Sequence, residues 1–220
     1  MNSMNSDFYE SAIAASHNGP DETFAAWGGP QQFLESYAEY LTKSGENIYS
    51  QLGTFDGKRL PETIDVSSPD GTYSWFFHSH ETTEPSREQH GHFHLFVKTS
   101  RPDCPSTPSR KPHLIAIELD HSGDLAGFFV PNCWTTQEDF LPAPEIIPHL
   151  SSFYAGDHTD LILVSLWISA ILRIFSEEIK NILIQRDVFV EKMPPSVRTT
   201  YFKNTSISRI CEWHLPQNVE

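Results

Sequence analysis

A strict two-residue alternation in the middle of the chain constrains the fold more than any other feature. Between residues 92 and 98, the even-numbered positions hold His92, His94, Phe96 and Lys98, and the odd-numbered positions are all apolar. Successive side chains of a strand point to opposite faces of a sheet. The pattern therefore predicts an antiparallel strand that has one apolar face and one mixed face.

Neighbouring segments carry similar signals. The predicted strands cover Tyr73–His80, His92–Lys98, His113–Asp120 and Leu125–Val130. His121-Ser122-Gly123-Asp124 fits a tight turn between the last two strands. The proline-rich segment Thr99–Pro112 is expected to be an extended loop. An antiparallel sheet of about four strands over residues 73–130 follows.

Helical periodicity flanks this sheet. We predict a short helix at Asp7–Ser16 and a second helix that begins at Pro30, a residue suited to the first helical turn. The second helix would bury apolar residues spaced three and four apart: Phe33, Leu34, Tyr37, Tyr40 and Leu41. On the C-terminal side, a short helix at Pro142–Ser151 precedes a long one, which runs from an Asp157 N-cap to about Leu183.

These elements predict an α+β fold in a single domain over residues 1–220, with the sheet packed on N- and C-terminal helices. Two segments give weaker signals. Thr54–Gly71 contains prolines and an Asp-Gly turn, which predict irregular structure, and the tail from Ser196 onward is ambiguous.

Charge and composition narrow the range of partners. Fifteen basic and twenty-nine acidic residues leave a formal net charge of −14, which disfavours nucleic acid and anionic lipid. The three cysteines show no Cys-x-x-Cys spacing, which argues against a disulfide framework and a thiolate zinc site. We expect a small-molecule substrate or a protein partner, with no nucleic acid and no membrane.

Two segments bear on where in the cell the protein is expected to be. The N-terminal residues show neither the basic nor the apolar region of a signal peptide, so a cytoplasmic protein is expected. The apolar run Leu161–Phe175 is shorter than the roughly twenty residues that a membrane span needs. A buried core helix is the favoured interpretation, with membrane attachment as the alternative.

Histidines gather at the edges of the first two predicted strands, at His78, His80, His90, His92 and His94. If the first three strands form a meander, His80 faces His92 and His78 faces His94. His94 would then lie opposite Glu118, and His92 opposite Asp120. All six of these side chains would share one face of the sheet.

Imidazoles and carboxylates gathered in this way predict a divalent metal site, with iron or zinc as the first candidates. The predicted ligands are His78, His80, His92, His94 and Asp120. Glu118 is predicted to act as a ligand or as a general base. The first hypothesis is therefore a metal-dependent enzyme of the non-haem iron oxygenase or zinc hydrolase type.

The same residues support a second chemistry. The run His90-Gly91-His92-Phe93-His94-Leu95-Phe96 resembles the histidine-triad signature. The resemblance implies that His92 attacks a nucleotide α-phosphate while His90 and His94 orient it and the phosphate. The chain departs from that signature at Gly91, where a bulky apolar residue is usual. It also continues for more than half its length after the motif and shows no glycine-rich phosphate cradle.

A broader resemblance covers about residues 73–139. Tyr73–His80, Glu88–Phe96, His113–Ile117 and Asn132–Asp139 together resemble a bacterial family of unknown function. The resemblance implies a single α+β domain and supplies no activity. A non-enzymatic accessory or interaction protein with surface histidines therefore stays open as a third interpretation. Burial distinguishes them, because ligand histidines should line a concavity and decorative ones should point into solvent.

Overall fold

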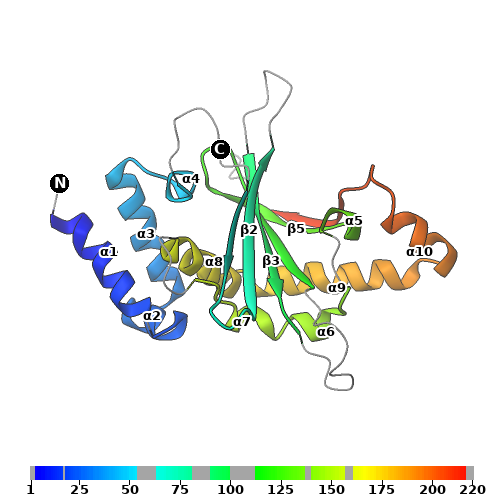
Figure 1. Ribbon diagram of the computed structural model, residues 1–220, viewed down its shortest axis with the longest axis horizontal. Helices are drawn as coiled ribbons and strands as arrows, with labels where there is room; N and C mark the ends of the chain where they lie inside the picture. Colours follow the sequence, from blue (N-terminus) through cyan, green and yellow to red (C-terminus); the bar gives the residue numbers. More distant parts are fainter. Residues whose placement is uncertain are drawn as a thin grey trace.

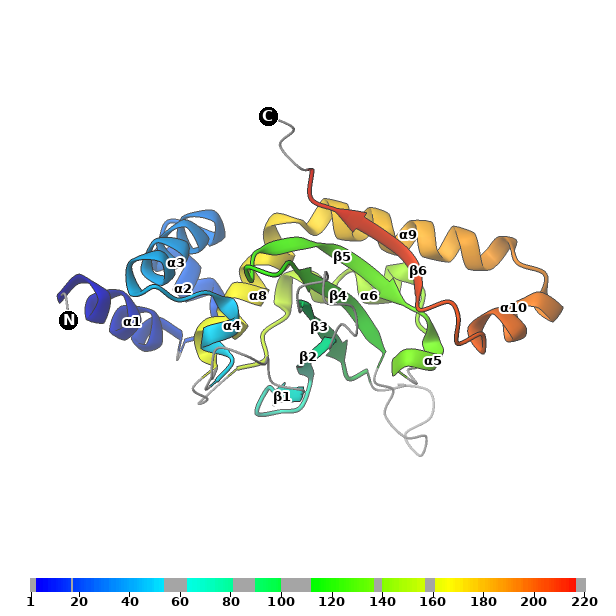
Figure 2. The same ribbon diagram turned by 90° about the horizontal axis from the view of Figure 1, so that it is seen from above.

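An antiparallel sheet forms the centre of the computed structural model, which describes residues 3–16, 18–53, 63–80, 90–99, 112–136, 140–156 and 161–216. In these residues six strands pair in chain order (Figures 1 and 2). The strands are β1 Thr63–Ser67, β2 Tyr73–His80, β3 His90–Val97, β4 His113–Leu119, β5 Leu125–Pro131 and β6 Arg209–His214. The four predicted strands are confirmed, and the α+β class with them.

The two edge strands were not predicted. β1 lies in the segment expected to be irregular, and β6 lies in the ambiguous tail. β1 has only five residues and is flanked by turn-forming residues. β6 completes the sheet by pairing with β5, far away in sequence. Short edge strands depend on pairing with a neighbouring strand more than on their own pattern.

Helices cover one face and both ends of this sheet. Their bounds are α1 Ser3–Ser16, α2 Pro20–Ala26, α3 Pro30–Ser44, α4 Ile48–Gln51, α5 Cys133–Thr136, α6 Ala143–Ile146, α7 His149–Ser152, α8 Ile162–Ile174, α9 Ser176–Lys192 and α10 Pro195–Phe202. α1, α2 and α3 gather at one end of the molecule and α10 lies at the other (Figure 2). α8 and α9 run along the sheet between them (Figures 1 and 2).

The predicted long C-terminal helix is in fact two helices, α8 and α9. The chain leaves the helical conformation at Phe175, with φ −97° and ψ 24°. Glu177 and Glu178 then occupy the first turn of α9, where the helix dipole favours acidic side chains. The prediction missed this new start because the apolar pattern continues through the break. Asp157, the predicted N-cap, lies outside the described residues.

α8 is buried along most of its length, which confirms the core-helix interpretation of this apolar run. Among the residues that the structure describes, no helix combines the length and apolar character that a bilayer crossing requires. The core forms where the apolar face of the sheet meets α8 and α3. Phe33, Tyr37 and Leu41 of α3 are buried as predicted, whereas Leu34 and Tyr40 are partly buried.

The apolar face of the sheet carries fully buried side chains from β2, β3 and β4. They include Trp75, Phe77, Phe93, Leu95, Ile115 and Ile117. The indole Nε1 of Trp75 donates to the carbonyl oxygen of Ala155 at 3.1 Å and to Ser165 Oγ at 3.0 Å. These bonds satisfy the one polar group of a wholly buried side chain and tie β2 to α8.

The cross-strand register differs from the predicted one by two residues. His78 pairs with His92, and His80 pairs with His90. The reason is that β3 begins at His90, before its predicted start at His92. His92 likewise lies opposite Glu118, and not opposite Asp120. A shift of two residues keeps His78, His92 and Glu118 on the predicted face, whereas a shift of one would reverse them.

Gly91 provides a test of this packing. A Cβ atom added to Gly91 would lie 2.2 Å from Cζ of the buried Phe77 ring. Gly91→Ala should therefore displace that ring and lower the free energy of unfolding by about 1–3 kcal/mol. Urea unfolding measures the change, and Ser67→Ala on the exposed part of β1 is the control. Equal stability of the two variants would contradict this packing.

Candidate metal centre

Three histidines from two neighbouring strands meet on the face of the sheet opposite α8. His78 comes from β2, and His92 and His94 come from β3. One ring nitrogen of each lies within 4.8 Å of the others. The ring centroids of His78 and His92 are 4.1 Å apart, and those of His92 and His94 are 4.7 Å apart. We call these three residues the histidine cluster.

The geometry of the cluster follows from the strand pattern. His92 and His94 are two residues apart in β3 and so share a face. His78 lies directly across from His92 in β2, where opposed side chains approach most closely. Nothing beyond two regular strands in the observed register is needed to bring three imidazoles together.

Aromatic side chains enclose the cluster. Phe76 stacks on His94 with ring centroids 4.7 Å apart, and the ring of Phe129 meets His92 edge-on at 5.2 Å. His92 and His94 are buried, with 5% and 3% of their surfaces exposed, and His78 is half-buried. A buried site with apolar walls restricts solvent access, which controls the reactivity of metal-bound water. Such burial is unlike that of decorative surface histidines.

His113 supports the cluster from β4. Its Nε2 lies 2.9 Å from Nδ1 of His94, within hydrogen-bonding distance. Burial, together with the charges of Arg186 and His92, lowers the pKa of His113 to about 3. If neutral His113 carries its proton on Nδ1, its Nε2 accepts a hydrogen bond from His94 Nδ1. His94 is then left with Nε2 as its ligand atom, an arrangement common among metal-binding histidines.

Glu118 lies beside the cluster but is engaged elsewhere. Its carboxylate accepts from both terminal nitrogens of Arg209 on β6, one of them at 3.1 Å. Arg209 also donates to Glu212 at 3.1 Å and lies 4.1 Å above the ring of Phe129. The predicted general base is therefore held in an ion pair next to the cluster.

The other predicted site residues are placed differently. Asp120 lies beyond the end of β4, where its Oδ1 accepts from the backbone N–H groups of Ser122 and Asp124 at 2.9 and 3.0 Å. The structure does not bring Asp120 together with the histidine cluster. His80 and His90 pair across β2 and β3 through their backbones, and their side chains lie outside the described part.

Two residues of the site were missed by the sequence analysis, His113 and Arg209. The β3–β4 pairing is irregular between Leu95 and Phe96, and His113 of β4 therefore lies opposite Phe96 of β3. Such a bulge breaks the odd–even rule that the prediction used. Arg209 lies on the unpredicted β6. The sequence signal for it was weak, because a lone arginine in a tail indicates no particular site.

The structure also explains the departure from the histidine-triad signature. His92 and His94 share a face, as that signature requires, but Gly91 lies on the opposite face against Phe77. A bulky residue at this position would collide with the core. The histidine-triad role of His90, His92 and His94 stays a prediction.

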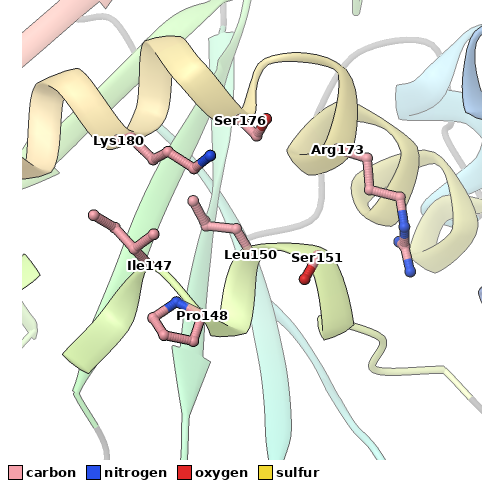
Figure 3. A pocket seen from close by; sticks show the side chains of 7 residues that line it. All are labelled: Ile147, Pro148, Leu150, Ser151, Arg173, Ser176 and Lys180. Atoms are coloured by element: carbon pink, nitrogen blue, oxygen red, sulfur yellow. The ribbon is translucent and has the colours of Figure 1, made fainter. Parts of the chain in front are cut away.

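A hollow of about 320 Å³ lies on the helical side of the molecule, between α9 and the α6–α7 segment (Figure 3). Ile147 and Leu150 contribute to its wall, and Arg173 and Lys180 contribute the basic groups. Both basic groups are already paired, Arg173 with Asp21 and Lys180 with Glu177. The lining of this hollow is therefore a weaker candidate for a catalytic or metal-binding site than the histidine cluster.

Fold and site together define an α+β protein with a buried three-histidine cluster on one face of an antiparallel sheet. The chain belongs to the family described as Domain of unknown function (DUF6969), whose model matches residues 31–214. No functionally curated protein and no solved structure matches the chain significantly. The family match contains all of the histidine cluster and supplies no activity.

The neutral state of His113 predicts an acid-sensitive fold. An unfolded histidine binds its proton near pH 6.5, whereas the pKa of folded His113 is lowered to about 3. The unfolded state therefore binds more protons between these values, and acid destabilises the fold by roughly 1.4 kcal/mol per pH unit in this window. The stability that neutral His113 contributes is complete above about pH 6.5 and is lost as the pH falls toward 3.

The measurement is the free energy of unfolding between pH 4 and pH 7 in the presence of a chelator. His113→Gln removes the titrating group, so its stability should depend less steeply on pH than that of the unaltered protein. Parallel curves for the two proteins would show that His113 does not contribute to acid sensitivity.

Proposed function

We propose that this protein is a metal-dependent enzyme in which His78, His92 and His94 hold a divalent transition metal. The observation that carries the proposal is the approach of three ring nitrogens, from three different side chains, to within 4.8 Å of one another. Burial of His92 and His94 and the bond between His94 and His113 give further support. Metal-binding histidines commonly have an apolar shell and a hydrogen-bonding partner on the ring nitrogen that does not bind the metal.

The three imidazole donors limit which metal ions the site is expected to bind. Imidazole suits zinc, iron, copper and nickel, whereas magnesium and calcium prefer oxygen ligands. Catalytic zinc sites use three protein ligands and keep a position for water or substrate. The common non-haem iron set needs a carboxylate with two histidines, and Glu118 is engaged with Arg209. Zinc is therefore our first candidate and iron the second.

A metal held in this way supplies Lewis acidity and an activated water molecule, which favours hydrolysis. Phe76 and Phe129 line the cluster and would favour contact with an apolar part of a small-molecule substrate. Glu118, directly opposite His92, is proposed as the general base, because each of its oxygens keeps a lone pair beside the bond to Arg209, and His90 is proposed as an acid–base histidine. Their roles are part of the proposal.

Metal content tests the site directly. Untagged protein purified without chelator should contain close to one equivalent of zinc or iron by mass spectrometry. His92→Ala combined with His94→Ala should reduce this content to background, because two of three ligands are lost. His121→Ala, in the exposed β4–β5 turn, is the control and should keep full occupancy. Full occupancy of the double variant would disprove the site.

His113 should act on metal affinity without being a ligand. His113→Ala removes the partner of His94 Nδ1 and should weaken zinc binding about 10–100-fold. His113→Gln retains an acceptor and should weaken zinc binding less. Competition with a coloured chelator measures both affinities. Equal affinity in His113→Ala and the unaltered chain would show that the bond to His94 does not support the ligand.

A protein that is isolated without metal and fails to bind added zinc, iron or copper would remove the metal-dependent proposal. The two other interpretations would then be compared. Histidine-triad chemistry predicts nucleotide binding that depends on His92, whereas an interaction protein predicts no such binding.

A further inference from the structure

We propose that Arg209 is a positioning residue that holds the Glu118 carboxylate away from the histidine cluster. It thereby keeps the metal centre a set of three neutral imidazoles. The inference rests on the proposed function, because it concerns the ligand set of the same site. It assigns a role to a residue of the last strand that lies outside the three-histidine ligand set.

Glu118 is close enough to be a ligand. It is the Cα partner of His92 in the β3–β4 pair. Directly opposed residues have Cβ atoms about 4.5–5.5 Å apart, and a glutamate side chain spans the remaining distance to a metal on its neighbour. Nevertheless, the residues whose ligand atoms converge are the histidines of the cluster, without Glu118. Another interaction must direct the carboxylate elsewhere.

That interaction is the two-point ion pair with Arg209. Nη1 donates to Oε2 of Glu118 at 3.1 Å, and Nη2 donates to Oε1. Only 13% of the Glu118 side chain is exposed, so the pair is largely shielded from water. A bidentate guanidinium–carboxylate pair fixes both oxygens of the carboxylate, which a single point charge does not. The ring of Phe129 supports the guanidinium from below.

Gly127 lets β6 approach β5 closely beside Glu118. It pairs with Glu118 on one side and with His214 on the other, so it lies on the row that joins β4 to β6. A Cβ atom at Gly127 would lie 2.2 Å from the carbonyl oxygen of Trp213. Glycine therefore permits the close approach of β6 at His214, whose Nδ1 lies 4.0 Å from Oε2 of Glu118, whereas Arg209 reaches Glu118 from its place opposite Pro131.

The consequence is chemical. Three neutral imidazoles leave the full charge of a divalent ion to polarise bound water. A coordinated carboxylate would reduce that charge and shift the ligand set toward the histidine–carboxylate type that iron enzymes use. Arg209 would in this way determine both the metal preference and the acidity of the centre, although it lies outside the ligand set.

Cobalt(II) tests the inference, because its visible absorption reports the number and type of ligands. The full-length protein is loaded with Co²⁺ alone, and four proteins are compared: the unaltered chain, Glu118→Gln, Arg209→Met, and Arg209→Met with Glu118→Gln. Methionine keeps an apolar stem over Phe129 without donors. Circular dichroism confirms that each variant is folded.

We expect the unaltered chain and Glu118→Gln to give the same spectrum, because Glu118 is not a ligand. Arg209→Met should give a weaker, shifted band as the carboxylate joins the metal, and the double variant should restore the original spectrum. A change in Arg209→Met that persists in the double variant, or no change, overturns the inference.

The comparison of the unaltered chain with Glu118→Gln stays decisive even if Arg209→Met does not fold. A spectral difference between these two proteins would show that Glu118 already coordinates the metal. Failure of the unaltered chain to bind Co²⁺ would instead remove the metal site itself, so the two failures are distinguishable.

Discussion

The burial of one side of β3 against the helices is the constraint on which the rest of the structure depends. Phe93, Leu95 and Val97 are fully buried in the core. Because side chains alternate along a strand, His92 and His94 are then forced onto the other face. Any slip of one residue would turn His92 and His94 into the apolar core and remove Phe93, Leu95 and Val97 from it, at a cost of several kcal/mol. The histidine cluster is thus held in place by core packing.

The polar side chains on the buried face of β3 and β4 need hydrogen-bonding or charged partners, and neighbouring strands supply them. The His94–His113 bond joins β3 to β4, and the Arg209–Glu118 pair joins β4 to β6. Breaking either interaction would remove a partner from a buried polar or charged group, which is more costly than never burying that group. The face is therefore stabilised as a network. It is also the part of the molecule where chemistry and stability are most closely coupled.

Much of this arrangement could be predicted from the chain. β2 was predicted with its observed bounds, α3 with its start, and α8 as a buried helix. Strong, local periodicity explains these successes. The register was wrong by two residues because loop length cannot be read from composition. The break at Phe175 was missed because the apolar pattern runs through it, and His113 was missed because a bulge changes the parity of the strand.

By itself, the sequence determined that one face of a central strand is apolar and that its other face carries histidines, because alternation is a local property of the backbone. It also determined the α+β class, since helical and strand periods occur in separate segments. Only the tertiary structure decided which imidazoles meet, that Glu118 pairs with Arg209, and that Asp120 belongs to a turn. Those outcomes depend on register, on a bulge and on an edge strand that returns from the C-terminal region. The meeting of the imidazoles and the Glu118–Arg209 pair are set by contacts between residues far apart in the chain, which local patterns do not encode. Asp120 bonds within its own turn, and the strand register places Glu118, not Asp120, opposite His92.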